Sequence, residues 1–288
     1  MNTGAIIAVD LGGTKIRIGR VANQIVTEQF SRAVPTTDTD HVVIAEIADA
    51  IRDLLKPDVV AIGIGVPSVV DVDRGIVYNV QNIPSWKEVH LKQILERDFQ
   101  IPVHVNNDAN CFVLGECYFG KGRGFRDIVG LTIGTGLGGG IIIDRKLYSG
   151  GNCGAGEIGM IPYRDQIIEY YCSGQFFMRE CGMSGEQIFE RATSGDRDAI
   201  RLYEKFGREM AHAIVTALYS YDPQIIILGG SVSRAFQFFK QPMMERVVSL
   251  FAYPHALDRL AVENSELPDV ALLGAAALHL DSLEKSNS

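Results

Sequence analysis

Two short glycine-rich segments, DLGGTK at residues 10–15 and GTGLGG at residues 134–139, each interrupt an otherwise apolar, strand-like run. Glycines permit positive φ angles and let a ligand approach the backbone closely. Successive N–H groups in such turns form a concavity that binds anions. Thr14 and Thr135 add hydroxyl donors, and Lys15 adds a positive charge. Either turn alone would be explained as an ordinary tight hairpin, but two equivalent turns favour a shared nucleotide.

Asp10 stands at the end of the strand that leads into the first of these turns. A carboxylate in this place is suited to hold Mg²⁺ directly or through water. GTGLGG also matches the dinucleotide-binding pattern G-x-G-x-x-G, but that pattern requires a helix to begin within it. Here GGIIIDRK continues as a strand, and no segment has P-loop spacing, so both alternatives are rejected.

The segment NNDAN, residues 106–110, follows a short strand and precedes a helical pattern. Any single residue of it could be an ordinary helix cap. Three asparagines around one aspartate are richer than a cap requires, and the carboxyl end of a strand in an open α/β sheet faces the ligand crevice. Asp108 is therefore a candidate general base, with Asn107 positioning the group that it deprotonates.

The elements that must position these residues follow from hydrophobic periodicity. Residues 5–31 predict three short strands, residues 40–54 a helix with Asp40 as its N-cap, and residues 59–66 a strand buried on both faces. A similar order recurs later in the chain. Its elements are two strands within 127–144, a third starting at 146, a helix at 196–221, a strand at 224–230, a helix at 233–250 and a closing helix.

This repetition predicts an α/β protein of two related lobes that face each other across a cleft. The expected boundaries are a small lobe of residues 1–116 and a large lobe of residues 117–268. The closing helix, residues 269–282, is expected to pack back on the small lobe. A chain of 288 residues also exceeds the usual size of a single domain.

The amino-acid composition limits the classes of partner that the protein is expected to bind. A net charge of −8 and the absence of basic runs argue against nucleic acid and against an anionic membrane. No stretch approaches the roughly 20 apolar residues that span a bilayer, and the N-terminus has no signal-peptide pattern. The five cysteines match no disulfide or metal framework, which indicates a reducing, cytoplasmic location.

The segments DLGGTK, GIGVPS, NNDAN, GTGLGGG, GAGEIG and LGGS occur in the order in which the ROK family of sugar kinases and sugar-responsive repressors carries them. The chain resembles this family over roughly its whole length. The resemblance implies the two-lobed, actin-like (ribonuclease H-like) ATPase fold, a duplicated βββαβα unit, that actin and hexokinase share. It also implies ATP-dependent phosphorylation of a hexose, and a homodimer is expected.

The resemblance assigns roles to individual positions. Asp108 matches the catalytic base, and Asp10 lies near Mg²⁺. The implied nucleotide contacts are Gly12, Gly13, Thr14, Lys15, Gly134, Thr135, Gly136, Gly229 and Gly230. The implied sugar contacts are Gly65, Asn82, Asn107, Asp108, Glu157 and Glu169.

One departure from the family pattern concerns metal. The family usually follows GAGEIG with a histidine and a cysteine-rich loop that binds zinc, whereas this chain has Met160 and lacks the loop. Cys172 falls outside the ligand positions, so no zinc is expected. This departure puts the identity of the sugar in doubt.

The substrate alternatives follow from the resemblance. Glucose, phosphorylated to glucose 6-phosphate, is the first choice, with an N-acetylhexosamine or fructose as alternatives. The family's repressors carry a helix-turn-helix domain ahead of the first strand, and that strand is expected to begin near Ala5. A non-catalytic sugar sensor would not need Asp108 or both phosphate turns, so a kinase is expected.

Overall fold

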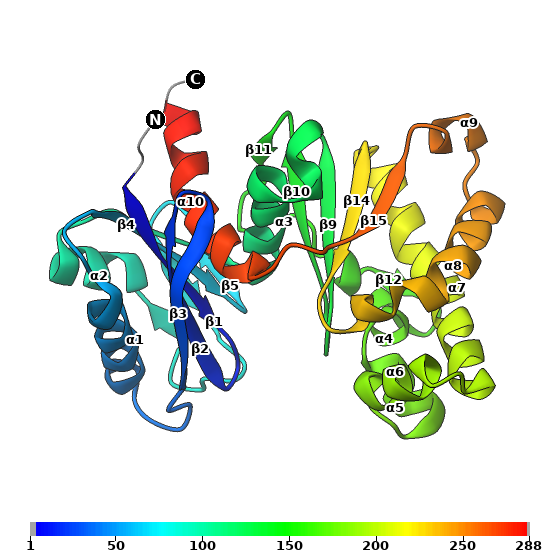
Figure 1. Cartoon of the computed structure of the whole chain (residues 1–288), viewed down its shortest axis with the longest axis horizontal. Helices are drawn as coiled ribbons and strands as arrows, with labels where there is room; N and C mark the ends of the chain where they lie inside the picture. Colours follow the sequence, from blue (N-terminus) through cyan, green and yellow to red (C-terminus); the bar gives the residue numbers. More distant parts are fainter. Residues whose placement is uncertain (1–3, 287–288) are drawn as a thin grey trace. The chain divides into compact units, whose positions relative to one another are not determined.

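The chain folds into two compact units, each with most of its contacts within itself. Figure 1 shows the chain coloured along its sequence. The structure is a computed structural model that describes residues 4–286. Unit 1 comprises the described residues up to Arg123, together with Lys146–Ala155 and the segment from Leu267 onward. Unit 2 comprises Gly124–Arg145 and Gly156–Glu266. The boundary expected between residues 116 and 117 falls inside a helix of unit 1.

Unit 1 is built on a five-stranded sheet with the order β3-β2-β1-β4-β8. The first three strands are antiparallel neighbours, whereas β1, β4 and β8 run parallel. Parallel strands end at the same edge of a sheet, so Asp10, Gly65 and Asn107 lie at one edge. The strands are β1 (Ala5–Leu11), β2 (Lys15–Ala22), β3 (Ile25–Ala33), β4 (Val59–Val66) and β8 (Val103–Asn107).

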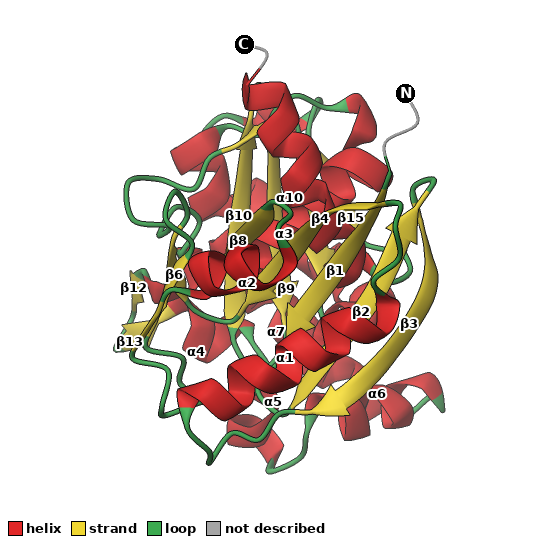
Figure 2. Ribbon diagram, turned by 90° about the vertical axis from the view of Figure 1, so that its left-hand side faces the viewer, coloured by secondary structure: helices red, strands yellow, loops and turns green. Residues whose placement is uncertain are grey.

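Both faces of this sheet are covered, as the apolar run of residues 59–66 predicts. Ile62 and Ile64 of β4 join the core beneath α1, and Figure 2 shows α1 lying across the sheet. Gly63 faces the opposite way, where a Cβ would overlap the carbonyl of Ala275, so glycine lets α10 approach the sheet. The remaining elements of unit 1 are α1 (Asp40–Leu54), α2 (Leu91–Phe99), α3 (Asp108–Phe119), α10 (Val270–Ser286), β5 (Val69–Asp71), β6 (Ile76–Tyr78), β7 (Glu88–Val89) and β11 (Lys146–Leu147).

The predicted N-cap of α1 is wrong. Thr39 is the N-cap residue, and its carbonyl accepts the N–H groups of Val42 and Val43 at 3.1 and 3.2 Å. Asp40 is the first helical residue, and its carboxylate accepts the His41 N–H at 2.8 Å. Asp40 still stabilises the helix, because a negative charge in the first turn is attracted to the positive end of the helix dipole.

The sheet of unit 2 repeats this arrangement. Within the unit, its strands follow the order β10-β9-β14-β15, with β9 antiparallel to β10 and parallel to β14. The order matches that of β2, β1, β4 and β8, so the duplication expected from the sequence is present. The strands are β9 (Ile128–Ile133), β10 (Leu137–Ile143), β14 (Ile225–Gly229) and β15 (Ala261–Asn264).

A long helix, α7 (Arg197–Tyr221), packs against α8 (Phe236–Leu250) and forms the centre of the unit 2 core. Its buried aromatic side chains, Tyr203 and Phe206, contact Phe239 of α8. The helix predicted at 233–250 begins as the 3-10 helix η3. The other elements of this unit are η2 (Ile158–Met160), β12 (Pro162–Tyr163), β13 (Gln166–Ile167), α4 (Ile168–Cys172), α5 (Gln175–Cys181), α6 (Gly185–Thr193), η3 (Val232–Ala235) and α9 (Pro254–Leu257); η1 (Lys121–Gly124) joins the two units.

The closing helix, α10, packs against α3, β4 and β1 within unit 1. Its Gly274 has no room for a side chain because a Cβ would overlap the carbonyl oxygen of Cys111 in α3. Every helix among the described residues is too short or too polar to cross a bilayer.

Candidate functional site

The first glycine turn joins β1 to β2 at one edge of the unit 1 sheet. The Gly12 N–H donates to the Lys15 carbonyl at 2.9 Å, which closes the turn. Thr14 and Lys15 are exposed at its tip. A Cβ on Gly13 would lie 2.5 Å from Nδ2 of Asn82, so that side chain rests against the turn. The structure thus brings a predicted sugar contact beside the predicted phosphate segment.

Asp10 lies on β1 directly before this turn and opposite Arg17 of β2. Burial raises the pKa of Asp10, and the nearby guanidinium of Arg17 partly offsets that effect. Its side chain keeps partial contact with solvent. A desolvated carboxylate favours a cation beside it, and oxygen ligands suit Mg²⁺, so this position fits a magnesium ion.

Asp108 begins α3 immediately after β8 ends. The N-cap is Asn107, whose side-chain oxygen accepts the Ala109 N–H at 2.8 Å, and Oδ1 of Asp108 accepts the same N–H at 2.9 Å. Nδ2 of Asn107 donates to the Ser68 carbonyl at 3.3 Å. These contacts orient both side chains, while Asp108 remains exposed to solvent.

The strand register places Gly65 between Asp10 and the NNDAN segment. Gly65 pairs with Asp10 of β1 on one side and with Asn106 of β8 on the other. A Cβ at this position would lie 3.1 Å from Sγ of Cys111 and 3.8 Å from Cα of Asp108. Glycine at this position therefore lets the start of α3, which carries Asp108 and Cys111, lie close to β4.

A buried network beneath this edge was not found from the sequence. Oδ1 of Asn106 accepts from the Asn107 N–H at 2.8 Å, from Asn110 Nδ2 at 2.9 Å and from Sγ of Cys153 at 3.3 Å. Asn106 and Asn110 are each about 1% exposed. The network holds the junction of β8 and α3 in place. The sequence gives no signal for the part that Cys153 plays in it, because Cys153 lies far from the NNDAN segment along the chain.

The second glycine turn, in unit 2, joins β9 to β10. The Gly134 N–H donates to the Gly136 carbonyl at 2.9 Å, and the Gly134 carbonyl accepts the Gly174 N–H at 2.8 Å. Thr135 is exposed at the tip. The Leu137 N–H donates to Oε2 of Glu169 at 2.8 Å. The structure therefore places a predicted sugar-contacting carboxylate directly against the predicted phosphate turn.

Gly230 follows β14 next to this turn. Its φ of +86° is in the left-handed region, and a Cβ would overlap the backbone of Ile133, so both conformation and space require glycine. Gly229 ends β14 and pairs with Thr132 of β9. The predicted LGGS segment thus lies beside the end of β9, where the second turn begins.

A cavity of about 720 Å³ opens beside these glycines within unit 2. Gly134 and Thr135 line it, whereas Gly136, Gly229 and Gly230 do not. The guanidinium of Arg234 lies 5.2 Å from the centre of the Phe189 ring, and both side chains line the cavity. Neither residue carries a sequence pattern that points to a ligand. The cavity offers aromatic and charged surface next to backbone donors.

Glu157 and Glu169 form a pair of carboxylates in unit 2. Burial raises the pKa of Glu157, and the negative charge of Glu169 raises it further. Gly159 of η2, two residues after Glu157, packs against β10 and α4: a Cβ there would overlap the Leu137 carbonyl and approach Cβ of Glu169 to 3.4 Å. Gln175 Nε2 donates to the other oxygen of Glu169 at 3.3 Å.

The expected loss of zinc concerns Met160 and Cys172. Met160 is 57% exposed, whereas Cys172 is fully buried in the unit 2 core. Across residues 4–286, no group of three or more His, Cys, Asp or Glu side chains is arranged to hold a metal ion. The absence of zinc from the protein stays a prediction.

Comparison with known proteins defines the class. Residues 6–282 match the model of the ROK family. A glucokinase of Thermotoga maritima is 30% identical over 95% of this chain and 96% of that protein. An N-acetyl-D-glucosamine kinase of Yersinia pseudotuberculosis is 29% identical over 94% of this chain and 97% of that protein.

Among solved structures, the ROK family glucokinase of Streptomyces griseus, determined with glucose and AMPPNP, superposes with a TM-score of 0.82. It is 30% identical, and the match covers 96% of this chain and 99% of that one. The duplicated sheets and the paired glycine turns define an actin-like ATPase fold of the hexokinase class. Within this class, the chain belongs to the ROK family.

Proposed function

We propose that this sugar kinase of the ROK family transfers the γ-phosphoryl group of ATP to a hexose hydroxyl, with Asp108 as the general base and glucose as the substrate. The observation that carries the proposal is the arrangement at the unit 1 sheet edge. Asp10, Gly65 and Asn107 lie near the carboxyl ends of three adjacent parallel strands, and the exposed side chain of Asp108 follows Asn107 at the start of α3. The glucokinases of Thermotoga maritima and Streptomyces griseus support glucose.

In this proposal Asp108 accepts the proton of the attacking sugar hydroxyl as the oxygen approaches phosphorus. Asn107, held by its bonds to Ala109 and Ser68, orients that hydroxyl. Gly65 and Asn82 of unit 1 and Glu157 and Glu169 of unit 2 are the remaining proposed sugar contacts. Phosphoryl transfer asks a protein chiefly for positioning and for stabilisation of charge. General-base catalysis contributes roughly 10²–10⁴-fold to the rate.

ATP is the proposed phosphoryl donor. The backbone N–H groups and hydroxyls of the two turns, Gly12 to Lys15 and Gly134 to Gly136, would contact its phosphates. The cavity lined by Phe189 and Arg234, with Gly229 and Gly230 nearby, would accept the nucleoside. Mg²⁺ held at Asp10 would neutralise phosphate charge when bound.

The proposal also covers the alternative substrates, the oligomeric state and the location. The Yersinia N-acetyl-D-glucosamine kinase favours an N-acetylhexosamine as the second candidate substrate, because its identity to this chain is nearly the same. Fructose is a third candidate. We also propose a homodimer, since twofold dimers are the commonest oligomers, and a cytoplasmic location, where ATP and magnesium are available.

The test is ADP release by the purified protein with ATP and Mg²⁺ across glucose, N-acetylglucosamine, N-acetylmannosamine, mannose and fructose. The wild-type protein should turn over at least one of these sugars, and Asp108→Asn should lower kcat by about 10²–10⁴-fold without loss of the fold. Sugar binding without turnover in the wild-type protein would instead identify a sensor.

A further inference from the structure

A small hairpin separates the two proposed sugar-contacting glutamates of unit 2. Glu157 precedes η2, strands β12 and β13 form the hairpin, and Glu169 lies in the first turn of α4. At the open end of the hairpin, the Ile168 N–H donates to the Ile161 carbonyl at 2.9 Å. The hairpin therefore connects the elements that carry the two carboxylates.

This hairpin cannot hold its own shape. Each strand contains two residues, and a two-stranded hairpin of any length is only marginally stable in water. Arg164 in its turn has a φ of +55°, a left-handed conformation that disfavours side chains with a Cβ. Side-chain contacts to the rest of unit 2 must therefore hold the hairpin in place.

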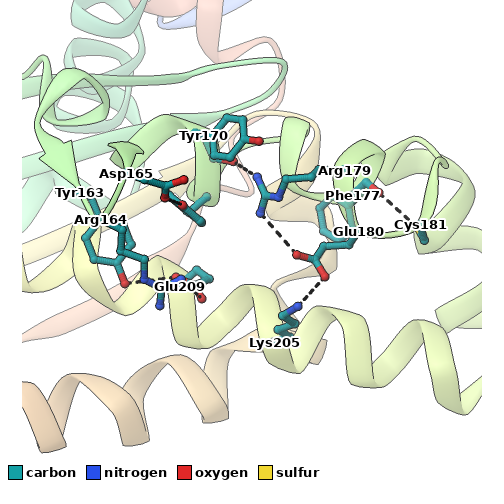
Figure 3. A network of polar contacts seen from close by, with 11 residues as sticks. Tyr163, Arg164, Asp165, Tyr170, Phe177, Arg179, Glu180, Cys181, Lys205 and Glu209 are labelled. Atoms are coloured by element: carbon teal, nitrogen blue, oxygen red, sulfur yellow. Dashed lines mark hydrogen bonds and ion pairs between the residues drawn. The ribbon is translucent and has the colours of Figure 1, made fainter.

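The main anchor is Glu209 of α7, which Figure 3 shows below the hairpin. Its Oε1 pairs with Nη1 of Arg164 at 3.1 Å, and its Oε2 accepts the hydroxyl of Tyr163 at 3.2 Å. Glu209 is only 9% exposed. A carboxylate so little exposed needs its partners, because removal of one partner of a buried pair leaves an uncompensated charge.

A second set of contacts joins the hairpin to α4. The Tyr171 hydroxyl donates to Oδ1 of Asp165, and the Arg164 guanidinium lies 5.1 Å from the centre of the Tyr171 ring and 4.8 Å from that of Tyr163. Arg179 of α5 lies 5.0 Å from the Tyr171 ring. Cation–π contacts of this kind add attraction between the hairpin, α4 and α5.

These five residues, Tyr163, Arg164, Asp165, Tyr171 and Glu209, form what we term the hairpin clasp. Tyr171 stands two residues after Glu169 on the same short helix. On the other side, η2 packs so closely that Gly159 has no space for a side chain between Leu137 and Glu169. A small shift of the hairpin would therefore change the distance between the two glutamates.

We propose that the hairpin clasp is the positioning device for Glu157 and Glu169, with Glu209 as its anchor. Glu209 and Arg164 then influence the affinity for sugar indirectly, because the hairpin that they hold connects η2, next to Glu157, with α4, which carries Glu169. As a statement about sugar affinity, this inference rests on the proposed function. As a statement about the glutamate pair, it stands on the structure of unit 2 alone.

The first test is kinetic. Glu209→Ala should raise the KM for the sugar roughly tenfold and leave the KM for ATP within about twofold, because misplacement of a contact by about 1 Å is costly. Glu209→Gln, which keeps an oxygen for Tyr163 but loses the ion pair with Arg164, should show a smaller increase. Lys205→Met is the matched control, since it breaks an ion pair with Glu180 in the same region without touching the hairpin.

The second test needs no activity. The carboxyl carbon of Glu157 is titrated by ¹³C NMR in the ligand-free wild type, Glu209→Gln and Lys205→Met proteins. Separation of the glutamates should lower the pKa of Glu157 toward its ordinary value in Glu209→Gln only. An unchanged Glu157 titration together with an unchanged sugar KM would overturn the inference. If the wild type phosphorylates no sugar, the proposed function fails, and the titration alone still decides on the clasp.

Discussion

The two glycine turns close equivalent hairpins but are attached to the protein in different ways. Each turn is closed by its own backbone. In unit 1 the Thr14 carbonyl also accepts the Val34 N–H at 3.0 Å, and the acidic neighbour, Asp10, lies on the strand that leads into the turn. In unit 2 the turn is joined to the segment around α4. Gly174 donates to the Gly134 carbonyl, and the Leu137 N–H is occupied by the Glu169 carboxylate.

This difference shows that a repeated turn need not have a repeated role. The carboxylate beside the first turn is desolvated without a hydrogen bond to that turn, which suits a cation. The carboxylate beside the second turn, that of Glu169, accepts a hydrogen bond from the Leu137 N–H and so connects the turn to α4. We therefore expect mutations at the first turn to affect catalysis most and mutations at the second to affect stability and geometry first.

The largest expected effect tests the first half of this comparison. Asp10→Asn should lower kcat on the order of 10²–10³-fold, the size found when one group that stabilises transition-state charge is removed. The free energy of unfolding should stay the same or rise slightly, since burial already disfavours the charged form of Asp10. Initial rates and urea unfolding would measure both quantities. An unchanged kcat would remove Asp10 from the proposed magnesium position.

The next effect is on stability at the second turn. A Cβ at Gly139 would overlap the carbonyl oxygen of Gly156, a backbone atom that cannot rotate away. Gly139→Ala should therefore destabilise the protein by about 2–3 kcal/mol, as overpacked sites do. Gly134→Ala is the control, because no atom lies within 4 Å of a Cβ there, and its change should stay within about 0.5 kcal/mol. Equal urea midpoints for the two variants would contradict this reasoning.

A third prediction concerns the effect of pH on a pair of histidines in unit 1. His104 of β8 and His279 of α10 lie in unit 1, with Nε2 of His104 3.2 Å from Nδ1 of His279. Burial, and next the proximity of His279, lowers the pKa of His104 to about 4. Its pKa in the unfolded chain is about 6.5. Between these values the unfolded state binds more protons, so stability falls as the pH is lowered from about 6.5 to 4.

The loss should be about 1–2 kcal/mol after allowance for the partial exposure of the ring. Thermal unfolding at pH 7.5 and pH 5 would measure it, and His104→Gln should reduce the difference between the two. His255→Gln, at an exposed position of unit 2, is the control variant because it leaves the His104–His279 pair intact. The same pH dependence in His104→Gln as in the wild type would contradict this assignment.

The smallest expected effect is the change in stability when the charge of Glu169 is removed. Glu169→Gln keeps a carbonyl oxygen for the Leu137 N–H but removes the charge, so stability should change by less than about 0.5 kcal/mol. The pKa of Glu157 should fall because the repelling charge is gone. Glu169→Ala also loses the hydrogen bond and should cost about 1 kcal/mol more. Thermal unfolding and a ¹³C titration of Glu157 would show whether charge and hydrogen bond separate in this way.

Much of the fold was predictable because it depends on local pattern. Alternating apolar residues and glycine punctuation located both hairpins, and the helical stripe of residues 196–221 corresponds to α7 within one residue. The cap of α1 was mispredicted because Thr39 and Asp40 are both good cap residues, and only the backbone geometry distinguishes them. The clasp anchor Glu209 gave no signal, since it is one polar residue on a long amphipathic helix.

By itself, the sequence determined the two hairpins with their glycine turns, the long helices and buried strands that follow them, and the placement of Asp108 directly after a strand. These features depend on residue type and spacing along a few consecutive positions. Tertiary structure alone decided that Cys153 supports Asn106, that Glu169 binds the backbone of the second turn and that Glu209 holds the hairpin. Such contacts join residues far apart in the chain, and their energy comes from burial and from partners that no local pattern contains.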